Sequence, residues 1–178
     1  MRFRETPLPA VWLIEPERIG DERGWFARTF DQEEFAARGM DARVAQCNAS
    51  YNATRDTLRG MHYQAAPHGE SKLVRCVRGA IFDVAVDLRR DSPTFRAWHG
   101  VELSAENGHA LFIPAGLAHG FQTLQEDTEV LYQMGSEYAP GSERGVRFDD
   151  PAFAIEWPPP QSERTICERD RSYPDFAV

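Results

Sequence analysis

Residues 108–119 read Gly-His-Ala-Leu-Phe-Ile-Pro-Ala-Gly-Leu-Ala-His, and their pattern is the strongest indication of the fold. Its apolar part, Ala110–Ile113, predicts a short strand. Proline and glycine at positions 114 and 116 predict a tight turn after that strand. A strand followed by such a turn directs the next histidine, His119, into the mouth of a β-barrel.

The spacing Gly-x5-Pro-x-Gly-x2-His is that of the second cupin motif, and the surrounding sequence agrees with it. Strand-like runs separated by turn residues recur at 72–78, 81–88, 98–103 and 129–134. Short strands at this spacing indicate a sandwich or barrel rather than βαβ units. We therefore expect a single all-β domain over residues 1–178, a cupin jelly-roll (double-stranded β-helix) barrel.

Two segments are expected to depart from the barrel. A short helix is predicted near the N-terminus over residues 31–39, where Asp31 can cap its start, Glu34 occupies the capping-box position and Gly39 suits its end. From about residue 151 the chain, with three prolines at 158–160, predicts an irregular C-terminal wrap.

The run from Ile81 to Leu88 alternates strictly between two faces. Its large apolar face predicts packing between sheets, and its other face carries Asp83 and Asp87 around Ala85, which is typical of a strand whose polar face lines a cavity. A plain solvent-facing surface is the alternative for the polar face.

Charge and composition exclude several classes of protein. The chain has 178 residues, 42% of them hydrophobic and 27% charged, as is ordinary for a globular protein. Its net charge of −8 repels phosphates at long range and argues against a nucleic-acid partner, although clustered arginines could still bind a small anion. Its most hydrophobic stretch, 80–88, contains two aspartates, so we expect no membrane span.

The cysteines and the N-terminus predict the compartment. Cys47, Cys76 and Cys167 are odd in number and lack CxxC spacing, which argues against a disulfide framework or a zinc site. The first residues lack the apolar run of a signal peptide. We therefore expect a cytoplasmic protein.

Lys72 is the single lysine among the 20 basic residues, and the others are all arginine. An ammonium is a compact charge with three donors, unlike the planar guanidinium, so its retention at one position is consistent with a special role. The alternative is that codon bias replaced lysine by arginine throughout the chain and left a single lysine without a special role.

Metal binding is not expected. Metal cupins supply His-x-His and a Glu in their first motif, but here the corresponding stretch ends in His62, Tyr63 and Gln64. His62 and His119 alone make a poor site, which His68 and Glu70 would complete only if their loop turned inward. We expect no metal and no other cofactor.

A metal-free barrel of this kind still contains the groups that proton transfer at carbon requires. A histidine can act as a base near neutral pH, a nearby cation can stabilise an enolate, and a tyrosine on another strand can return the proton from the opposite face. The candidates in the motif-bearing segments are Arg59, His62, Lys72, His119 and Tyr132.

Several segments, in this order, resemble the dTDP-4-dehydrorhamnose 3,5-epimerase family. They are Thr57-Leu58-Arg59-Gly60-Met61-His62-Tyr63-Gln64, Lys72-Leu73-Val74-Arg75, the run 82–89, Pro114-Ala115-Gly116-Leu117-Ala118-His119-Gly120-Phe121 and Asp149-Asp150-Pro151. The resemblance extends from about Trp12 to Asp170. It implies a homodimer without cofactor, with strand exchange at its interface, that inverts C3 and C5 of dTDP-4-dehydro-6-deoxy-D-glucose to give dTDP-4-dehydro-L-rhamnose.

The resemblance also implies residue roles. His62 corresponds to the base, Tyr132 to the proton donor, and Lys72 to the cation near the keto oxygen. Asp170 corresponds to the carboxylate that pairs with the base, although Asp83 on the cavity face competes for that role on the sequence alone. Tyr138 corresponds to the residue that stacks on the thymine ring. The other positions implied to bind substrate are Arg23, Arg28, Gln46, Asn48, Arg59, His119, Glu143 and Arg169.

The sequence departs from the family pattern at a few binding positions. Arg28 stands where a glutamate is usual, which reverses the charge offered to the nucleotide, while Arg169 and Gln133 stand at frequent lysine positions. These changes concern the nucleotide and sugar more than the reaction. The alternatives are an epimerase that inverts one centre only, a metal-dependent cupin and a non-catalytic sugar-nucleotide-binding cupin.

Overall fold

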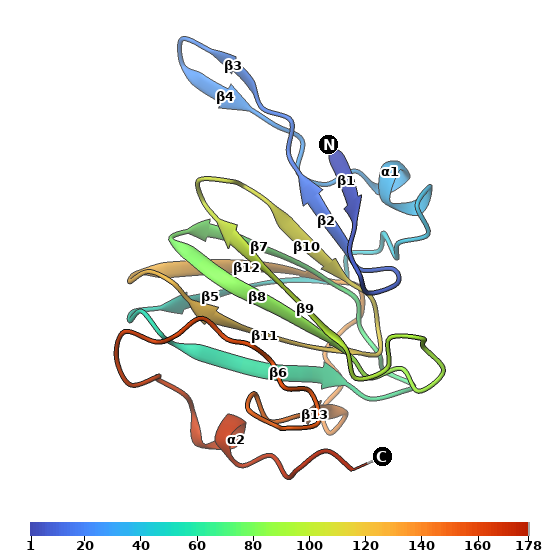
Figure 1. Ribbon diagram of the computed structural model, residues 1–178. Helices are drawn as coiled ribbons and strands as arrows, with labels where there is room; N and C mark the ends of the chain where they lie inside the picture. The colour runs from blue at the N-terminus through green and yellow to red at the C-terminus, as the bar shows by residue number, and fades with distance from the viewer. Residues whose placement is uncertain (178) are drawn as a thin grey trace.

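The protein is described by a computed structural model in which residues 1–177 are placed (Figure 1). Two antiparallel sheets face each other. The first has the order β1-β2-β10-β7-β12-β5 and the second β13-β6-β11-β8-β9. The predicted cupin-type β-barrel is confirmed.

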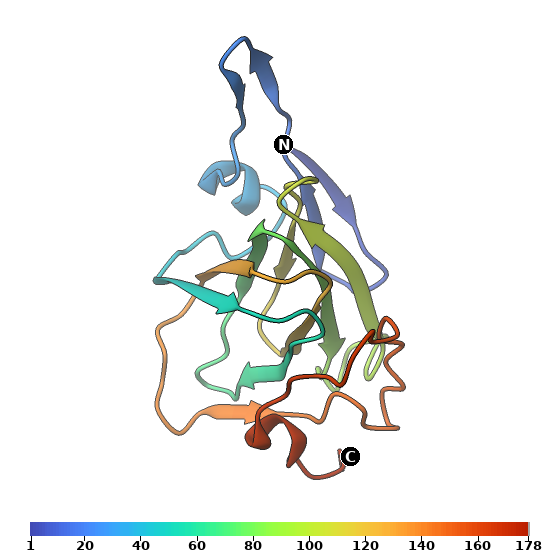
Figure 2. The same ribbon diagram turned by 90° about the vertical axis from the view of Figure 1, so that its left-hand side faces the viewer.

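The strands of the first sheet are β1 (Arg2–Glu5), β2 (Trp12–Glu15), β10 (Ala110–Ile113), β7 (Lys72–Arg78), β12 (Thr128–Met134) and β5 (Gln46–Asn52). Those of the second are β13 (Glu143–Gly145), β6 (Leu58–Gln64), β11 (Leu117–Thr123), β8 (Ala80–Asp87) and β9 (Trp98–Ser104). A separate hairpin, β3 (Ile19–Asp21) and β4 (Gly24–Phe26), projects from the barrel at the top of Figures 1 and 2.

The main core lies between the two sheets. Val74, Leu111 and Val130 of the first sheet pack in one cluster with Ile81 and Phe121 of the second. Each of these residues comes from the strand face that points inward, since alternate side chains along a strand lie on the same side of the sheet. Burial of these apolar side chains, at roughly 25 cal/mol per Å² of apolar surface, is what holds the sheets together.

The expectation that the large apolar face of strand 81–88 packs between the sheets is wrong. Ile81 and Ala85, the neighbours of Asp83 on its face, lie in the core between the sheets. Val84 and Val86 lie on the outer face of β8 and pack with Phe153 of the C-terminal segment. The irregular segment that follows β13 supplies an apolar cover for this outer face, which is why both faces of β8 are buried.

The short N-terminal helix is present but is limited to α1 (Gln32–Ala36). Asp31 caps it, because its side chain accepts hydrogen bonds from the amides of Glu33 and Glu34. The Glu34 carboxylate lies 3.7 Å from Arg38 instead of completing a capping box. A second helix, α2 (Glu168–Arg171), lies in the C-terminal segment and was not predicted from the sequence.

Within residues 1–177, no helix combines the length and the apolar composition that crossing a bilayer demands.

Candidate active site

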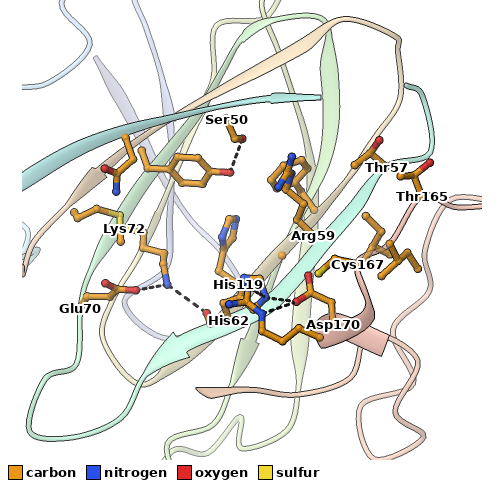
Figure 3. Close-up of a pocket in the computed structure, with 18 residues that line it drawn as sticks. Ser50, Thr57, Arg59, His62, Glu70, Lys72, His119, Thr165, Cys167 and Asp170 are labelled. Carbon is orange, nitrogen blue, oxygen red and sulfur yellow. Dashed lines mark hydrogen bonds and ion pairs between the residues drawn. The ribbon is translucent and has the colours of Figure 1, made fainter. Parts of the chain in front are cut away.

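A cavity of about 550 Å³ opens between the sheets and the C-terminal segment. A second cavity of about 200 Å³ adjoins it and shares His62, Glu70 and Arg169 among its lining residues. Figure 3 shows the first cavity, with Ser50, His62 and Lys72 projecting into it from three different strands.

Strand alternation explains why these side chains meet. On β7, Lys72 shares the inward face with Val74 and Cys76 of the core. On β12, Tyr132 shares it with Val130. Cross-strand pairing then sets the alignment, because Tyr132 lies opposite both Asn48 and Val74, and Met134 lies opposite Lys72.

The two histidines of the site face each other across β6 and β11. His62 pairs with His119 in register, and the register shifts immediately afterwards. At this irregularity the backbones approach so closely that a Cβ on Gly60, whose φ is +120°, would lie 2.5 Å from the Gly120 Cα. Two glycines are therefore required beside the histidines.

His62 is held by Asp170. His62 Nε2 lies 2.7 Å from Asp170 Oδ1, and Asp170 Oδ2 accepts a hydrogen bond of 3.0 Å from the Gly60 amide. Burial alone would raise the pKa of Asp170, but the hydrogen bonds from His62 and Gly60 outweigh it and lower the pKa to about 2. An ionised Asp170 requires a donor at Nε2, which leaves the lone pair of neutral His62 on Nδ1.

Arg169, the neighbour of Asp170 on α2, borders the same pair. Its Nη2 lies 3.2 Å from His62 Nε2 and its Nε lies 3.3 Å from Asp170 Oδ1. Because His62 Nε2 carries a proton that it donates to Asp170, it cannot accept a hydrogen bond from Arg169, and Arg169 pairs with the Asp170 carboxylate instead. The Arg169 guanidinium lies at the cavity wall.

Lys72 is buried, with only 7% of its surface exposed. Its ammonium lies 2.8 Å from Glu70 Oε1 and donates to the carbonyl oxygen of His62 at 3.3 Å. The side chain therefore reaches the part of the cavity wall that carries His62 (Figure 3).

Tyr132 approaches the cavity from the first sheet, which also carries Lys72, whereas His62 belongs to the second sheet. Its hydroxyl lies 3.1 Å from Ser50 Oγ, and its ring makes an edge contact with His119. Burial raises the pKa of Tyr132 far above its usual value, so the phenol keeps its proton at neutral pH.

Asp83 pairs with the other histidine. His119 Nε2 lies 2.7 Å from Asp83 Oδ1, and both side chains are buried. The structure thus assigns Asp170 to His62 and Asp83 to His119. Among the described residues, the second Asp83 oxygen is buried without a hydrogen-bond partner.

Most of the predicted binding residues line the two cavities. Arg59 donates to Asn52 Oδ1 at 2.7 Å, and Asn48 borders both cavities. The smaller cavity is lined by Gln46, Tyr138 and Glu143, where Gln46 accepts from the Tyr138 amide at 2.9 Å and the Tyr138 hydroxyl donates to the Glu143 carboxylate.

Arg23 and Arg28 lie outside both cavities. Arg23 is on the projecting β3–β4 hairpin, is highly exposed and pairs with Asp21. Arg28 follows the hairpin and pairs with Asp31 at 2.6 Å. A single chain does not bring these two arginines to the site.

Gln64, which stands at the position of a metal-binding histidine, is engaged in a different network. Its Oε1 accepts from the Ala139 amide at 2.8 Å and from Ser142 Oγ at 2.9 Å, and its Nε2 donates to Glu70 Oε2 at 2.9 Å. In residues 1–177 there is no group of three His, Cys, Asp or Glu side chains arranged to hold a metal ion.

Sequence reasoning missed several lining residues. Ser50 was not predicted as a site residue, and Glu70 was considered only as a possible metal ligand. Tyr173, whose ring makes an edge contact with His62, lies in a segment with no regular pattern. Ser50 lies two residues from Asn48 on β5 and therefore on the same face of the strand, and this spacing is the signal that would have identified Ser50.

The chain matches the family model for dTDP-4-dehydrorhamnose 3,5-epimerase over residues 5–177. A curated dTDP-4-dehydrorhamnose 3,5-epimerase from Sinorhizobium fredii is 44% identical over 176 residues, covering 99% of this chain and 90% of the relative. A dTDP-4-dehydrorhamnose 3-epimerase from Streptomyces niveus is 40% identical over 159 residues, covering 89% of this chain and 76% of the relative.

The fold has close counterparts among solved structures. The crystal structure of dTDP-4-dehydrorhamnose 3,5-epimerase from Bacillus anthracis, with TDP and PPi bound, superposes with a TM-score of 0.93 at 38% identity. The alignment covers 98% of this chain and 99% of that one.

Proposed function

Because this chain belongs to the dTDP-4-dehydrorhamnose 3,5-epimerase family, we propose that it is an isomerase that epimerises a nucleotide-linked 4-keto-6-deoxyhexose at C3 and C5. The substrate is dTDP-4-dehydro-6-deoxy-D-glucose and the product is dTDP-4-dehydro-L-rhamnose. The observation that carries the proposal is the convergence of the His62–Asp170 pair, the Lys72 ammonium and the Tyr132 phenol on one cavity.

The chemistry follows from these four side chains. Asp170 holds the proton of His62 on Nε2, so that Nδ1 can remove a proton from a carbon beside the keto group. The electron pair moves onto the keto oxygen, where Lys72 stabilises the enolate charge. Tyr132, protonated because burial raises its pKa, delivers a proton to the opposite face of the planar enolate and so inverts the centre.

Nucleotide binding is assigned to the arginine-lined wall and the smaller cavity. Arg59 and Arg169 offer guanidinium groups that suit a diphosphate, and Tyr138 in the smaller cavity offers an aromatic face on which the thymine ring of the nucleotide can stack. Gln46, Asn48, His119 and Glu143 complete the polar lining.

We also propose that the protein is a homodimer. Ile19, Trp25 and Phe26 of the β3–β4 hairpin are exposed, although each is large and apolar. The hairpin carries Arg23 and leads into Arg28, so insertion into a second copy would bring both arginines to that copy's cavity.

The proposed compartment is the cytoplasm, and the proposed organisation is one domain over the whole chain. All three cysteines are free, which suits a reducing compartment. Packing of Phe153 and Trp157 against the outer face of β8 supports treating the C-terminal segment as part of the same domain.

A second candidate function is inversion at one centre only. It is favoured by the similarity to the Streptomyces niveus 3-epimerase, at an identity close to that of the 3,5-epimerases. The same base, cation and acid serve both reactions, and the outcome depends on how the sugar is oriented between His62 and Tyr132.

Solvent deuterium incorporation into dTDP-4-dehydro-6-deoxy-D-glucose, followed by NMR and mass spectrometry, tests the proposal. Label at both C3 and C5 is expected with the wild type and with His109→Ala, a histidine outside the cavities, and no label is expected with His62→Ala. Label at one carbon would establish the single-centre enzyme.

Other outcomes would point to the remaining alternatives. Binding of the nucleotide sugar by wild type without any label would indicate a non-catalytic binder. Turnover that is lost on treatment with a chelator and restored by a divalent ion would indicate a metal-dependent cupin.

A further inference from the structure

Glu70 is a partly buried carboxylate that the proposed reaction does not use. It lies in the loop between β6 and β7, its side chain is 11% exposed, and it borders both cavities. Burying a charged group is costly unless it is paired, so its surroundings should explain its presence.

Each oxygen of Glu70 meets a different donor. Oε1 lies 2.8 Å from Lys72 Nζ, and Oε2 accepts from Gln64 Nε2 at 2.9 Å. A carboxylate accepts on both oxygens, whereas an amide of the same shape offers one acceptor and one donor. Glutamine at this position would therefore lose one of the two contacts.

Gln64 in turn is fixed by the loop that follows β12. Its Nε2 also contacts the Glu137 carbonyl oxygen at 3.2 Å, and its Oε1 accepts from Ala139 and Ser142. Exchanging the amide nitrogen and oxygen would place like groups against each other at Glu70, at the Glu137 carbonyl and at the Ala139 amide, so Gln64 holds Glu70 in one orientation.

The consequence of this arrangement is a fixed position for the Lys72 ammonium. A lysine side chain is flexible, and an ammonium has three donors. Glu70 and the His62 carbonyl take two of them within residues 1–177, which leaves one N–H for the cavity (Figure 3). The Glu70 carboxylate and the His62 carbonyl oxygen thus determine the direction in which the third N–H of Lys72 points.

We propose that Glu70 is a positioning residue, which fixes the Lys72 ammonium so that its remaining N–H faces the keto oxygen of the substrate. This inference rests on the proposed function of Lys72 in stabilising the enolate. Stabilisation in the transition state depends on a donor that is already in place, so a loss of orientation lowers the rate more than it lowers substrate binding.

The test uses Glu70→Gln, with Glu15→Gln as the matched control. Glu15 is also a partly buried glutamate paired with a basic side chain, Arg4, at 2.7 Å, but it lies outside both cavities. For Glu70→Gln we expect kcat on dTDP-4-dehydro-6-deoxy-D-glucose to fall by about 10- to 100-fold, while KM and the Kd for TDP change by less than about twofold. Glu15→Gln should match the wild type.

A second readout does not require turnover. Lys72 is the only lysine in the chain, so protein labelled with 15N-lysine has one side-chain ammonium signal. Hydrogen bonding to Glu70 slows proton exchange, and we expect the NMR signal of the Lys72 ammonium in the wild type and in Glu15→Gln, and its loss by broadening in Glu70→Gln.

Three results would overturn the inference. They are an unchanged ammonium signal in Glu70→Gln, an unchanged kcat despite loss of the signal, and a fall in TDP affinity and unfolding temperature in proportion to the fall in kcat. If the wild type does not turn over the substrate, the proposed function fails, and the NMR comparison still decides whether Glu70 holds Lys72.

Discussion

At the scale of single residues, the site consists of paired groups whose partners are far apart in the sequence. His62 and Asp170 are 108 positions apart, and His119 and Asp83 are 36 apart. No local pattern encodes such a pair. Lys72 could be singled out from composition, and the other roles came from the resemblance. The choice between Asp83 and Asp170 required the structure, because both carboxylates are compatible with an inward histidine.

The Asp170→Asn variant tests the role of the carboxylate that orients His62. The amide can donate as well as accept, so it no longer enforces a proton on Nε2, and we expect kcat to fall by at least about 100-fold while TDP still binds. Isotope-exchange kinetics and calorimetric titration with TDP measure the two effects. An unchanged kcat would remove Asp170 from the mechanism.

The same variant should change the pH dependence of stability. The pKa of Asp170 lies at about 2 in the folded protein and near 4 when unfolded, so its ionisation stabilises the fold above about pH 4. This contribution, roughly 2 kcal/mol, is lost as the pH falls from about 4 to about 2. Urea unfolding of both proteins between pH 2 and 7 should show the difference shrinking over that interval.

At the scale of elements, alternation predicted which residues of a strand share a face. It did not predict which of the two faces points into the barrel and which points outward. The Asp83 face of β8 was predicted to line a cavity, but no residue of β8 lines either cavity, and Asp83 reaches the site only through its contact with His119. The apolar face lies outside, beneath the C-terminal segment. Both faces of that strand are buried, so it lacks the usual contrast between a polar, solvent-exposed face and an apolar, buried face that would indicate its orientation. The four-residue helix α2 is shorter than the window over which helical periodicity can be detected.

Asp56 attaches the C-terminal segment to the barrel. It is 1% exposed, and its carboxylate accepts from the amides of Gln161 and Ser162 and from Gln122 Nε2. Because Asp56→Ala leaves these donors without an acceptor, we expect the free energy of unfolding to fall by about 3 kcal/mol.

Denaturant unfolding and limited proteolysis check this prediction. The segment after residue 150 should become the first site of cleavage in Asp56→Ala. The control is Asp149→Ala, which removes an exposed carboxylate paired with Arg147 and should change stability by less than about 0.5 kcal/mol. Equal stability of the two variants would contradict the role of Asp56.

At the scale of the whole molecule, the all-β architecture followed from strand spacing and one turn motif, while the cavity depends on how two sheets and the C-terminal segment meet. The outer face of the first sheet also carries exposed apolar side chains on adjacent strands, namely Tyr51, Val77 and Leu131. Such a face, together with the apolar hairpin, fits the proposed homodimer.

Leu131→Asp tests this assembly. A charge at the centre of a buried apolar interface is costly, so we expect the wild type to sediment as a dimer and Leu131→Asp to sediment as a monomer at micromolar concentration. Glu102→Ala, on the exposed side of the edge strand β9, is the control and should remain a dimer. A monomeric wild type would refute the proposed assembly.

The position of Asp170 and Arg169 in the last described helix also has a consequence for biosynthesis. The barrel strands, with His62, Lys72 and Tyr132, precede Asp170 in the chain and leave the ribosome before it. A nascent chain can therefore contain the strands that carry His62 and Lys72 before it contains Asp170, the partner of His62. On the proposed mechanism, catalytic competence is acquired only once Asp170 has been translated and has reached His62.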